Sequence, residues 1–428
     1  MRKQLNDKLS KKILILCDMF PPAFAPRMGY LCKYMKQSGW EPVVVTEYID
    51  EHTFDFLKGI CEVTYVNFYP VKNKLLKKLL WIATVTADYL FSYKERKMVK
   101  VASGIVQKGD FGTVLCSTYR TFPLPAAFTV ADRFNLPLVA DHRDIIEQYA
   151  GKEYIANKCR VFPWADRMLT ELFTRKLLSE RNKVLPKVDC ITTVSTWHVD
   201  LLRRYNPNVK LIYNGYDPEL FYPDHTPTKE FSLTYTGRML SFAIRDPRPL
   251  FEAILRLHTE GIITPDLFRV KWYMDKHSEQ MVADEADLYG LWDYMDFYPY
   301  VEASMIPAIL NKSSILLQLA NVASSNGPKG IMTTKLFEAM AVEKPMLCVR
   351  SDEACLEAAI REANAGGSAR NADEAYDFIK YYYTQWKANG YTSVEVRKEV
   401  LKKYSRKEQA LQYMELFTEL QQQRINNG

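Results

Sequence analysis

The predicted organisation of this 428-residue chain is built around one stretch, Asn326-Gly-Pro-Lys-Gly-Ile-Met-Thr-Thr-Lys-Leu-Phe-Glu-Ala-Met-Ala-Val-Glu-Lys-Pro345. It follows an apolar run at residues 314–320 that predicts a buried strand. Its glycines, proline and paired threonines lead into a predicted helix, on which Lys335 and Glu338 lie one turn apart on one face. Free N–H groups at a helix N-terminus attract anions, so the stretch predicts an anion site. By itself it also fits an ordinary strand-loop-helix of an α/β sheet.

The composition narrows the class of protein. Hydrophobic residues make up 47% and charged residues 25%, a balance typical of soluble globular proteins, and the length suggests two or three domains. A net charge of +6 without an aromatic-basic signature predicts no nucleic-acid partner. The 8 cysteines are scattered without a C-x-x-C pair, which predicts reduced thiols in a cytoplasmic protein and no metal site. We find no signal-peptide core before Ile13 and no run of membrane-spanning length.

A βαβ unit is expected at the start of the chain. Residues 13–17 predict a buried strand, residues 18–27 a proline-rich loop and residues 29–36 a helix, and a second strand follows. Ligands bind α/β proteins at the carboxyl ends of strands, so Arg27 and Gly29 are predicted to belong to a cleft loop. Gly29 fits a close approach of backbone to a ligand, and tight packing is the alternative. No G-x-G-x-x-G motif follows the strand, which argues against an NAD-type dehydrogenase.

Residues 71–100 interrupt the alternation of strands and helices. Lysines flank an apolar run at residues 79–87, and this pattern is typical of a basic amphipathic helix. Such a helix binds membrane surfaces through its apolar face and its lysines. The segment therefore predicts a peripheral membrane contact, and a surface helix packed on the sheet is the alternative.

A strand predicted at residues 136–144 ends in Asp141-His-Arg-Asp144. Two carboxylates, an imidazole and a guanidinium are costly to bury without partners. The tetrapeptide therefore predicts a cleft in which charge is used, with a structural salt-bridge cluster as the alternative.

The second half of the chain repeats the α/β pattern. Asn-Gly followed by Asp-Pro at residues 214–218 is turn chemistry and predicts a domain boundary. Residues 231–236 predict a strand that runs directly into Gly237 and Arg238, with Arg245 shortly after. The expected domains are residues 1–217 and 218–404, followed by a terminal helix at 405–428. We expect an α/β architecture of two doubly wound domains that face each other across a cleft.

Several of these stretches, in the same order, resemble glycosyltransferase family 4 (glycosyl transferases group 1), whose fold is GT-B. The matching stretches, numbered in this sequence, are 13–30, 139–144, 193–195, 213–222, 235–238 and 330–345. The resemblance implies two Rossmann-like domains, the first binding the acceptor and the second the nucleotide-sugar donor. It also implies that the C-terminal helix crosses back to the first domain.

The resemblance implies roles for single residues. Those implied to bind the donor diphosphate are Arg238, Arg245, Thr333, Thr334 and Lys335. Glu338 would accept the ribose hydroxyls, and Tyr300 and Val301 would lie near the nucleobase. The implied catalytic set is Asp141, His142, Arg143 and Asp144, with Asp141 or Asp144 favoured over His142 for contact with the sugar. Gly330 stands where the family has the first acid of its E-x7-E pattern.

The implied reaction transfers a sugar from a UDP- or GDP-type donor to a glycan or lipid-linked glycan. It would retain anomeric configuration and need no metal or other cofactor, within bacterial surface polysaccharide or glycolipid synthesis. The protein is then expected in the cytoplasm, with a peripheral contact to the inner face of the plasma membrane. A GT-B nucleotide-sugar epimerase is one alternative, and a catalytically silent nucleotide-sugar-binding protein is another.

Overall fold

The computed structural model describes residues 9–23, 25–148, 163–239, 241–242, 245–320, 332–350 and 354–427. The chain divides into two compact units. Unit 1 comprises Met1–Tyr213 together with Arg406–Gly428, and unit 2 comprises Asn214–Ser405. The C-terminal helix is thus part of the first unit. None of the helices in the described part of the chain combines the length and the apolar character needed to cross a membrane.

Unit 1 is built on a seven-stranded sheet of order β3-β2-β1-β4-β5-β6-β7, in which every neighbouring pair is parallel. Its strands are β1 (Lys12–Cys17), β2 (Glu41–Glu47), β3 (Glu62–Val66), β4 (Thr113–Thr118), β5 (Leu138–His142), β6 (Cys190–Thr193) and β7 (Val209–Leu211). Its helices are α2 (Pro26–Gln37), α3 (Lys74–Phe91), α4 (Tyr93–Val106), α5 (Leu124–Arg133), α6 (Pro163–Val184), α7 (Thr196–Leu202) and α15 (Arg406–Asn427). Short 3-10 turns are η1 (Asp55–Leu57), η2 (Ile146–Gln148) and η3 (Leu185–Lys187).

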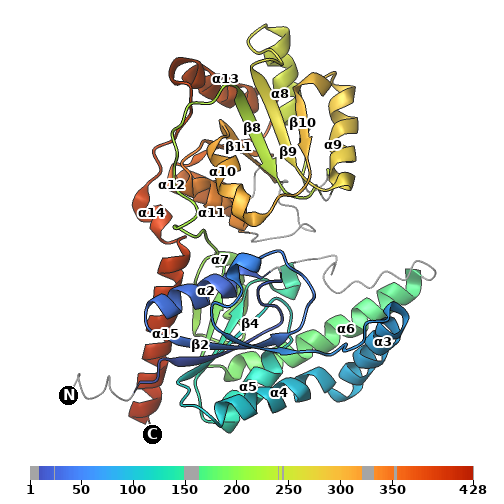
Figure 1. The fold of residues 1–428 in the computed structure, drawn as a ribbon, viewed down its shortest axis with the longest axis vertical. Helices are drawn as coiled ribbons and strands as arrows, with labels where there is room; N and C mark the ends of the chain where they lie inside the picture. The colour runs from blue at the N-terminus through green and yellow to red at the C-terminus, as the bar shows by residue number, and fades with distance from the viewer. Residues whose placement is uncertain are drawn as a thin grey trace. The chain divides into compact units, whose positions relative to one another are not determined.

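Helices cover both faces of this sheet (Figure 1). Successive side chains of β1 point to opposite faces, as the two-residue period of a strand requires. Ile13 and Ile15 enter a core with α2 and α15, whereas Leu14 and Leu16 enter a second core with α4 and α5. Both faces are therefore buried, which explains why the strand reads as a continuous apolar run.

Unit 2 repeats this plan with a six-stranded parallel sheet of order β10-β9-β8-β11-β12-β13. Its strands are β8 (Phe231–Thr236), β9 (Phe268–Tyr273), β10 (Met295–Tyr298), β11 (Ile315–Leu319), β12 (Met346–Val349) and β13 (Gly366–Ala369). Its helices and 3-10 turns are α8 (Arg248–Thr259), α9 (Lys276–Leu288), η4 (Trp292–Tyr294), η5 (Ala303–Met305), α10 (Ile306–Asn311), α11 (Thr334–Ala341), α12 (Ala354–Ala363), α13 (Ala372–Asn389) and α14 (Lys398–Lys402). The predicted α/β fold with two doubly wound sheets is confirmed.

The structure corrects the predicted cleft loop of unit 1. Helix α2 already begins at Pro26, because proline fits the first turn of a helix, so Arg27 and Gly29 are helical and buried. A Cβ on Gly29 would lie 2.7 Å from Pro21 Cγ and 3.1 Å from Leu57 Cδ1. Gly29 is thus a packing glycine, the alternative that the sequence left open.

Arg27 organises a buried polar cluster in unit 1. Its Nη2 donates to Asp141 Oδ1 at 3.1 Å and to Tyr413 Oη at 3.0 Å, and its Nη1 donates to the Tyr213 carbonyl at 3.0 Å. These contacts join α2, β5, the segment after β7 and the C-terminal helix α15. The cluster therefore connects the two separate parts of the chain that make up unit 1.

Asp141 accepts further hydrogen bonds in this cluster. Its Oδ1 accepts from Tyr413 Oη at 2.7 Å and from Thr192 Oγ1 at 3.0 Å, and its Oδ2 accepts from Ser117 Oγ at 2.8 Å. Burial by itself raises the pKa of a carboxyl group, but the charge of Arg27 and the hydroxyl donors hold the pKa of Asp141 below its ordinary value. We call Arg27, Ser117, Asp141, Thr192 and Tyr413 the Arg27 cluster.

We expect Asp141→Ala to lower the free energy of unfolding by about 3–5 kcal/mol, because it leaves the Arg27 guanidinium buried without its counter-charge. The matched control is Asp144→Ala in the same segment. Asp144 is partly exposed and pairs with Arg143, so its loss is expected to cost under about 1 kcal/mol. Urea unfolding followed by tryptophan fluorescence measures both variants. Equal losses in the two variants would contradict a structural role for Asp141.

Candidate functional site

The site in unit 2 lies where the strand order reverses, between β8 and β11. Chain connections leave this point of a doubly wound sheet in opposite directions, which opens a crevice at the carboxyl ends of the strands. Gly237 and Arg238 follow β8 directly at this edge. Helix α11, the predicted helix of the opening stretch, begins at Thr334 after β11.

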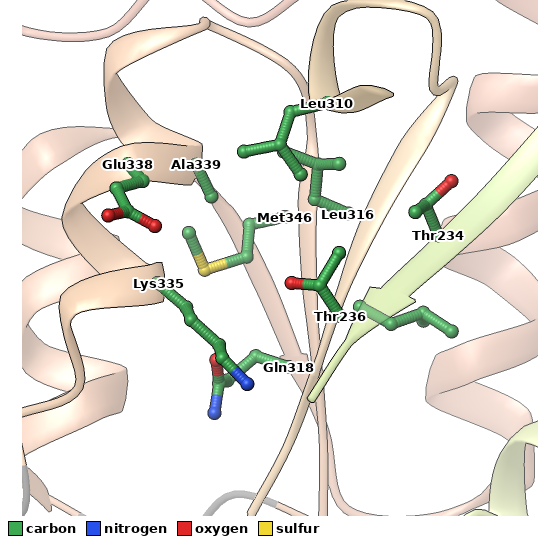
Figure 2. A pocket seen from close by; sticks show the side chains of 10 residues that line it. Thr234, Thr236, Leu310, Leu316, Gln318, Lys335, Glu338, Ala339 and Met346 are labelled. Carbon is green, nitrogen blue, oxygen red and sulfur yellow. The ribbon is translucent and has the colours of Figure 1, made fainter. Parts of the chain in front are cut away.

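A small pocket lies against α11 (Figure 2). Figure 2 shows Lys335 extending from α11 toward Gln318 of β11, with Glu338 one turn further along the same helix. The lining residues are Thr234, Thr236, Leu310, Leu316, Leu317, Gln318, Lys335, Glu338, Ala339 and Met346. The structure therefore brings a cation and a carboxylate to one pocket, as their spacing predicted.

Lys335 is a desolvated cation. Burial, and next the charge of Arg245, lower the pKa of its ammonium to about 8, and the charge of Glu338 opposes this shift. Its Nζ lies 5.7 Å from the centroid of the Tyr235 ring. Among the residues that the structure describes, no hydrogen bond or ion pair satisfies the ammonium. An anion entering here would give the ammonium an ion-pair partner that the described residues do not supply.

Gly237 makes room for this cation. Its φ is +146°, and a Cβ at this position would lie 1.8 Å from Lys335 Nζ. A side chain at residue 237 would thus be strained and would occupy the place of the ammonium. Glycine is favoured here chiefly by this φ, and the tip of Lys335 occupies the space that a Cβ would take.

Arg238 stands at the rim with its side chain 65% exposed. Its Nε lies 3.3 Å from Asp275 Oδ2, and the same carboxylate oxygen accepts from Tyr300 Oη at 3.0 Å. A backbone hydrogen bond from Ser278 is the first of the interactions that lower the pKa of Asp275 to about 2. Tyr300 and Arg238, predicted for the nucleobase and the diphosphate, therefore share one acid, Asp275, that sequence reasoning missed. Its position as N-cap of α9 directly after β9 was the available signal.

Arg245 folds back onto the same edge. Its Nη1 donates to Tyr235 Oη at 3.4 Å and also to the Arg238 carbonyl. Tyr235 in turn donates to the Arg238 carbonyl at 3.1 Å. Arg245 therefore holds the segment after β8 and adds positive charge beside Lys335.

The other residues predicted to bind the nucleotide-sugar lie at the start of α11 and after β10. Thr333 is the N-cap of α11 without a side-chain cap hydrogen bond, and Thr334 Oγ1 accepts from Asn214 Nδ2 at 3.1 Å. Val301 follows Tyr300 after β10 and is half-buried. Gly330 lies outside the described residues, so the position of the missing acid has no structural account.

In unit 1 the tetrapeptide at 141–144 separates into two buried and two partly exposed residues. Asp141 is 0% exposed and belongs to the Arg27 cluster, so in this structure it is enclosed by protein groups, and its predicted contact with the sugar stays a prediction. His142 is also 0% exposed, and burial is the first cause that lowers the pKa of its imidazole to about 3. The imidazole is therefore neutral and closed to solvent in this structure, and its predicted place in the catalytic set stays a prediction.

Arg143 and Asp144 remain accessible at the carboxyl end of β5. Arg143 Nε lies 3.2 Å from Asp144 Oδ2, and the guanidinium lies 5.6 Å from the centroid of the Tyr119 ring. Both are partly exposed. Of the predicted catalytic set, Arg143 and Asp144 are therefore the two side chains that are accessible to a ligand of unit 1.

Asp18 is a second acid at this edge, and sequence reasoning missed it. It follows β1 directly and its Oδ1 accepts from the Met19 backbone N–H at 3.0 Å, whereas Oδ2 is buried with no partner among the described residues. Burial raises the pKa of Asp18 to about 6, and the charge of Arg143 opposes this. An acid immediately after the first strand was the available signal.

Other site chemistry is limited in the described ranges. We find there no group of three His, Cys, Asp or Glu side chains placed to hold a metal ion. The candidate sites described in the two units are therefore built from cations, carboxylates and tyrosines near the carboxyl ends of strands.

Comparison with solved structures shows the GT-B fold. The chain resembles a glycosyltransferase from Rickettsia africae ESF-5 with a TM-score of 0.63 and 13% identity, over 96% of this chain and 99% of that one. It resembles sucrose-phosphate synthase from Thermosynechococcus elongatus with a TM-score of 0.59 and 14% identity, over 96% and 98%. Anabaena HepE in complex with UDP-glucose matches with a TM-score of 0.59 and 14% identity, over 95% and 99%. No protein-family model and no curated protein sequence matches the chain. Identities this low show the fold, whereas function depends on the site.

We expect Gly237→Ala to lower the free energy of unfolding by about 1–3 kcal/mol, because it strains the backbone and displaces the Lys335 ammonium. Gly261→Ala is the matched control, since Gly261 also has a positive φ (+69°) but has no atom within 4 Å of an added Cβ. Thermal denaturation of both variants measures the difference. A loss no larger for Gly237→Ala than for Gly261→Ala would contradict a special need for glycine at residue 237.

Proposed function

We propose that this protein is a glycosyltransferase that moves a sugar from a nucleoside-diphosphate sugar to an acceptor hydroxyl. The observation that carries the proposal is the desolvated Lys335 ammonium, which lies against Gly237 with Arg245 nearby at the switch point of unit 2. A pyrophosphate is an anion of the right kind for such a site. The GT-B fold, which the chain shares with the HepE structure described with UDP-glucose, supports the same reading.

The chemistry of sugar transfer makes demands that these residues can meet. As the glycosidic bond to the donor breaks, negative charge builds up on the departing diphosphate, and stabilising that charge lowers the barrier. Lys335 offers a buried charge, and Arg238 offers an exposed fork of N–H donors that suits phosphate oxygens. The first N–H groups of α11, at Thr333 and Thr334, add the positive end of a helix dipole.

The nucleoside end of the donor would lie on neighbouring strands. Glu338 faces the pocket one turn beyond Lys335 and is proposed to accept the ribose hydroxyls. Tyr300 and Val301 follow β10 and are proposed to lie near the base. Asp275 holds Tyr300 and Arg238 together, so it positions a group at each end of the nucleotide.

For the acceptor side we propose Asp144, Arg143 and Asp18 of unit 1. Asp144 replaces Asp141 as the acid that contacts the reacting sugar, because Asp141 is enclosed by the Arg27 cluster. The finer features remain those that the family resemblance implies: a UDP- or GDP-type donor, retention of configuration and no metal. A glycan or lipid-linked glycan acceptor in surface polysaccharide or glycolipid synthesis completes this proposal.

Thermal-shift screening of the full chain against UDP, GDP, ADP and their sugars tests donor binding. A nucleotide present at about a hundred times its dissociation constant should stabilise the folded state by roughly 2.7 kcal/mol. Incubation with the stabilising nucleotide-sugar and candidate acceptors then separates the possible activities. A glycosylated acceptor supports the transferase, epimerised or free sugar without acceptor supports the epimerase, and binding without turnover supports a silent binding protein.

We expect Arg238→Ala to lower kcat/KM by about 30- to 1000-fold, because a key charge-stabilising donor contributes about 2–4 kcal/mol to the transition state. Lys276→Ala is the matched control, because Lys276 is a neighbouring cation whose side chain is 90% exposed at the start of α9. The control should keep the activity of the natural chain. Undiminished turnover in Arg238→Ala would refute the assignment.

We expect affinity for UDP to fall as the pH rises above about 8, because the pKa of Lys335 is lowered to about 8. A bound diphosphate favours the charged ammonium, so above this pH binding must take up a proton, and affinity falls by up to about tenfold per pH unit. Isothermal titration from about pH 7.5 to about pH 9 measures this dependence. Lys335→Arg keeps its charge over this range and should bind with little pH dependence. A flat profile in the natural chain would contradict a role for Lys335 in binding.

A further inference from the structure

Helix α3 contributes little to the core of unit 1. Of its 18 residues, Thr84 is the one that is buried. Its exposed large apolar side chains are Leu75, Leu76, Leu79, Trp81, Ile82, Leu90 and Phe91, with exposed fractions from 46% to 69%. A surface helix packed on the sheet would bury such side chains, so this alternative from the sequence does not describe α3.

Four of the seven exposed apolar residues of α3 form a stripe. At 3.6 residues per turn, Leu75, Leu79, Ile82 and Leu90 lie on one side of the helix, and the buried Thr84 lies on the opposite side. The stripe therefore points away from the protein. Monomeric soluble proteins rarely expose contiguous apolar surface of this kind unless it binds something.

Helix α6 extends this surface. The ring of Phe173 in α6 packs edge-on against Tyr89 of α3, with centroids 5.3 Å apart, and the two helices lie side by side in Figure 1. The N-terminal half of α6 exposes a second apolar set at helical spacing, Trp164, Met168, Leu169 and Leu172. We call these exposed side chains of α3 and α6 the α3–α6 face.

The charges at the start of α3 are positive, whereas the N-terminal half of α6 carries Asp166 and Glu171 beside Arg167. Lys72, Lys74, Lys77 and Lys78 are all exposed at the start of α3, and Asp88 is the acid within that helix. In α6, Arg175 pairs with Glu171 at 3.0 Å, and Arg167 is exposed. Lysines next to leucines and a tryptophan match a surface that offers phosphate headgroups above hydrocarbon.

We propose that the α3–α6 face binds the surface of an anionic phospholipid bilayer. The apolar stripe would enter the boundary between headgroups and acyl chains, and the lysines at the start of α3 would contact lipid phosphates. The combination favours a bilayer over a folded protein partner, because protein interfaces are depleted in lysine. This inference rests on unit 1 alone and does not depend on the proposed nucleotide site.

Vesicle flotation of the full-length protein tests the proposal. The probes are vesicles of phosphatidylcholine alone and vesicles that also contain phosphatidylglycerol. We expect the natural chain to bind the mixed vesicles and to bind neutral ones far more weakly. Lys74→Gln and Lys78→Gln should each weaken binding about fivefold, the loss expected for one basic residue at a charged surface. Leu79→Glu combined with Ile82→Glu should weaken binding by more than about tenfold.

Leu288→Glu is the matched control, because Leu288 is an equally exposed leucine, 80% accessible, at the end of α9 in unit 2. It should leave vesicle binding unchanged. UDP binding and the thermal midpoint, measured in every variant, should also be unchanged, which separates this proposal from that of the nucleotide site. Failure of the natural chain to float with anionic vesicles would overturn the proposal. So would sedimentation showing that the α3–α6 face joins two copies of the chain and that Leu79→Glu with Ile82→Glu merely separates them.

Discussion

The buried ion pair between Arg27 and Asp141 is the interaction on which unit 1 depends. Both side chains are removed from solvent, and charges buried in this way are tolerated when they are paired and hydrogen-bonded. The partners come from α2, three neighbouring strands, the segment after β7 and the C-terminal helix. The chain leaves unit 1 after Tyr213 and re-enters it at Arg406. A specific set of hydrogen bonds therefore holds the C-terminal helix in unit 1. Apolar packing of α15 buries surface against unit 1, and the Arg27 cluster fixes the position of the helix along its axis.

The two units use charge in different ways. In unit 1 Arg27 and Asp141 pair with each other in the interior, and Arg143, Asp144 and Asp18 lie at the edge of the sheet. In unit 2 the Lys335 ammonium is desolvated and lies near the charge of Arg245, and the charge of Glu338 offsets these effects only in part. Arg27 is thus paired with an acid, whereas Lys335 has no hydrogen bond or ion pair among the residues that the structure describes. This contrast is the physical basis for placing a diphosphate in unit 2.

The sequence predicted the parts of the structure that depend on local patterns. The strands at β1 and β8, the helix that carries Lys335 and Glu338, and the doubly wound architecture follow from apolar runs and from turns between them. The role of Asp141 could not be predicted, because its hydrogen bond to Tyr413 joins residues 272 positions apart. The role of Asp275 could not be predicted for the same reason, because it depends on Arg238 and Tyr300 contacting one carboxylate. The amphipathic pattern of α3 was visible in the sequence, but its distance from the core and its contact with α6 were not.

The central claim is that a nucleoside diphosphate binds in unit 2 between the end of β8 and the start of α11. Hydrogen–deuterium exchange of the full chain, with and without saturating UDP, tests this claim most directly. We expect slower exchange at residues 236–239 and 332–338 when UDP is present, and unchanged exchange at residues 141–144. Protection confined to unit 1, or binding that leaves both segments of unit 2 unprotected, would contradict it.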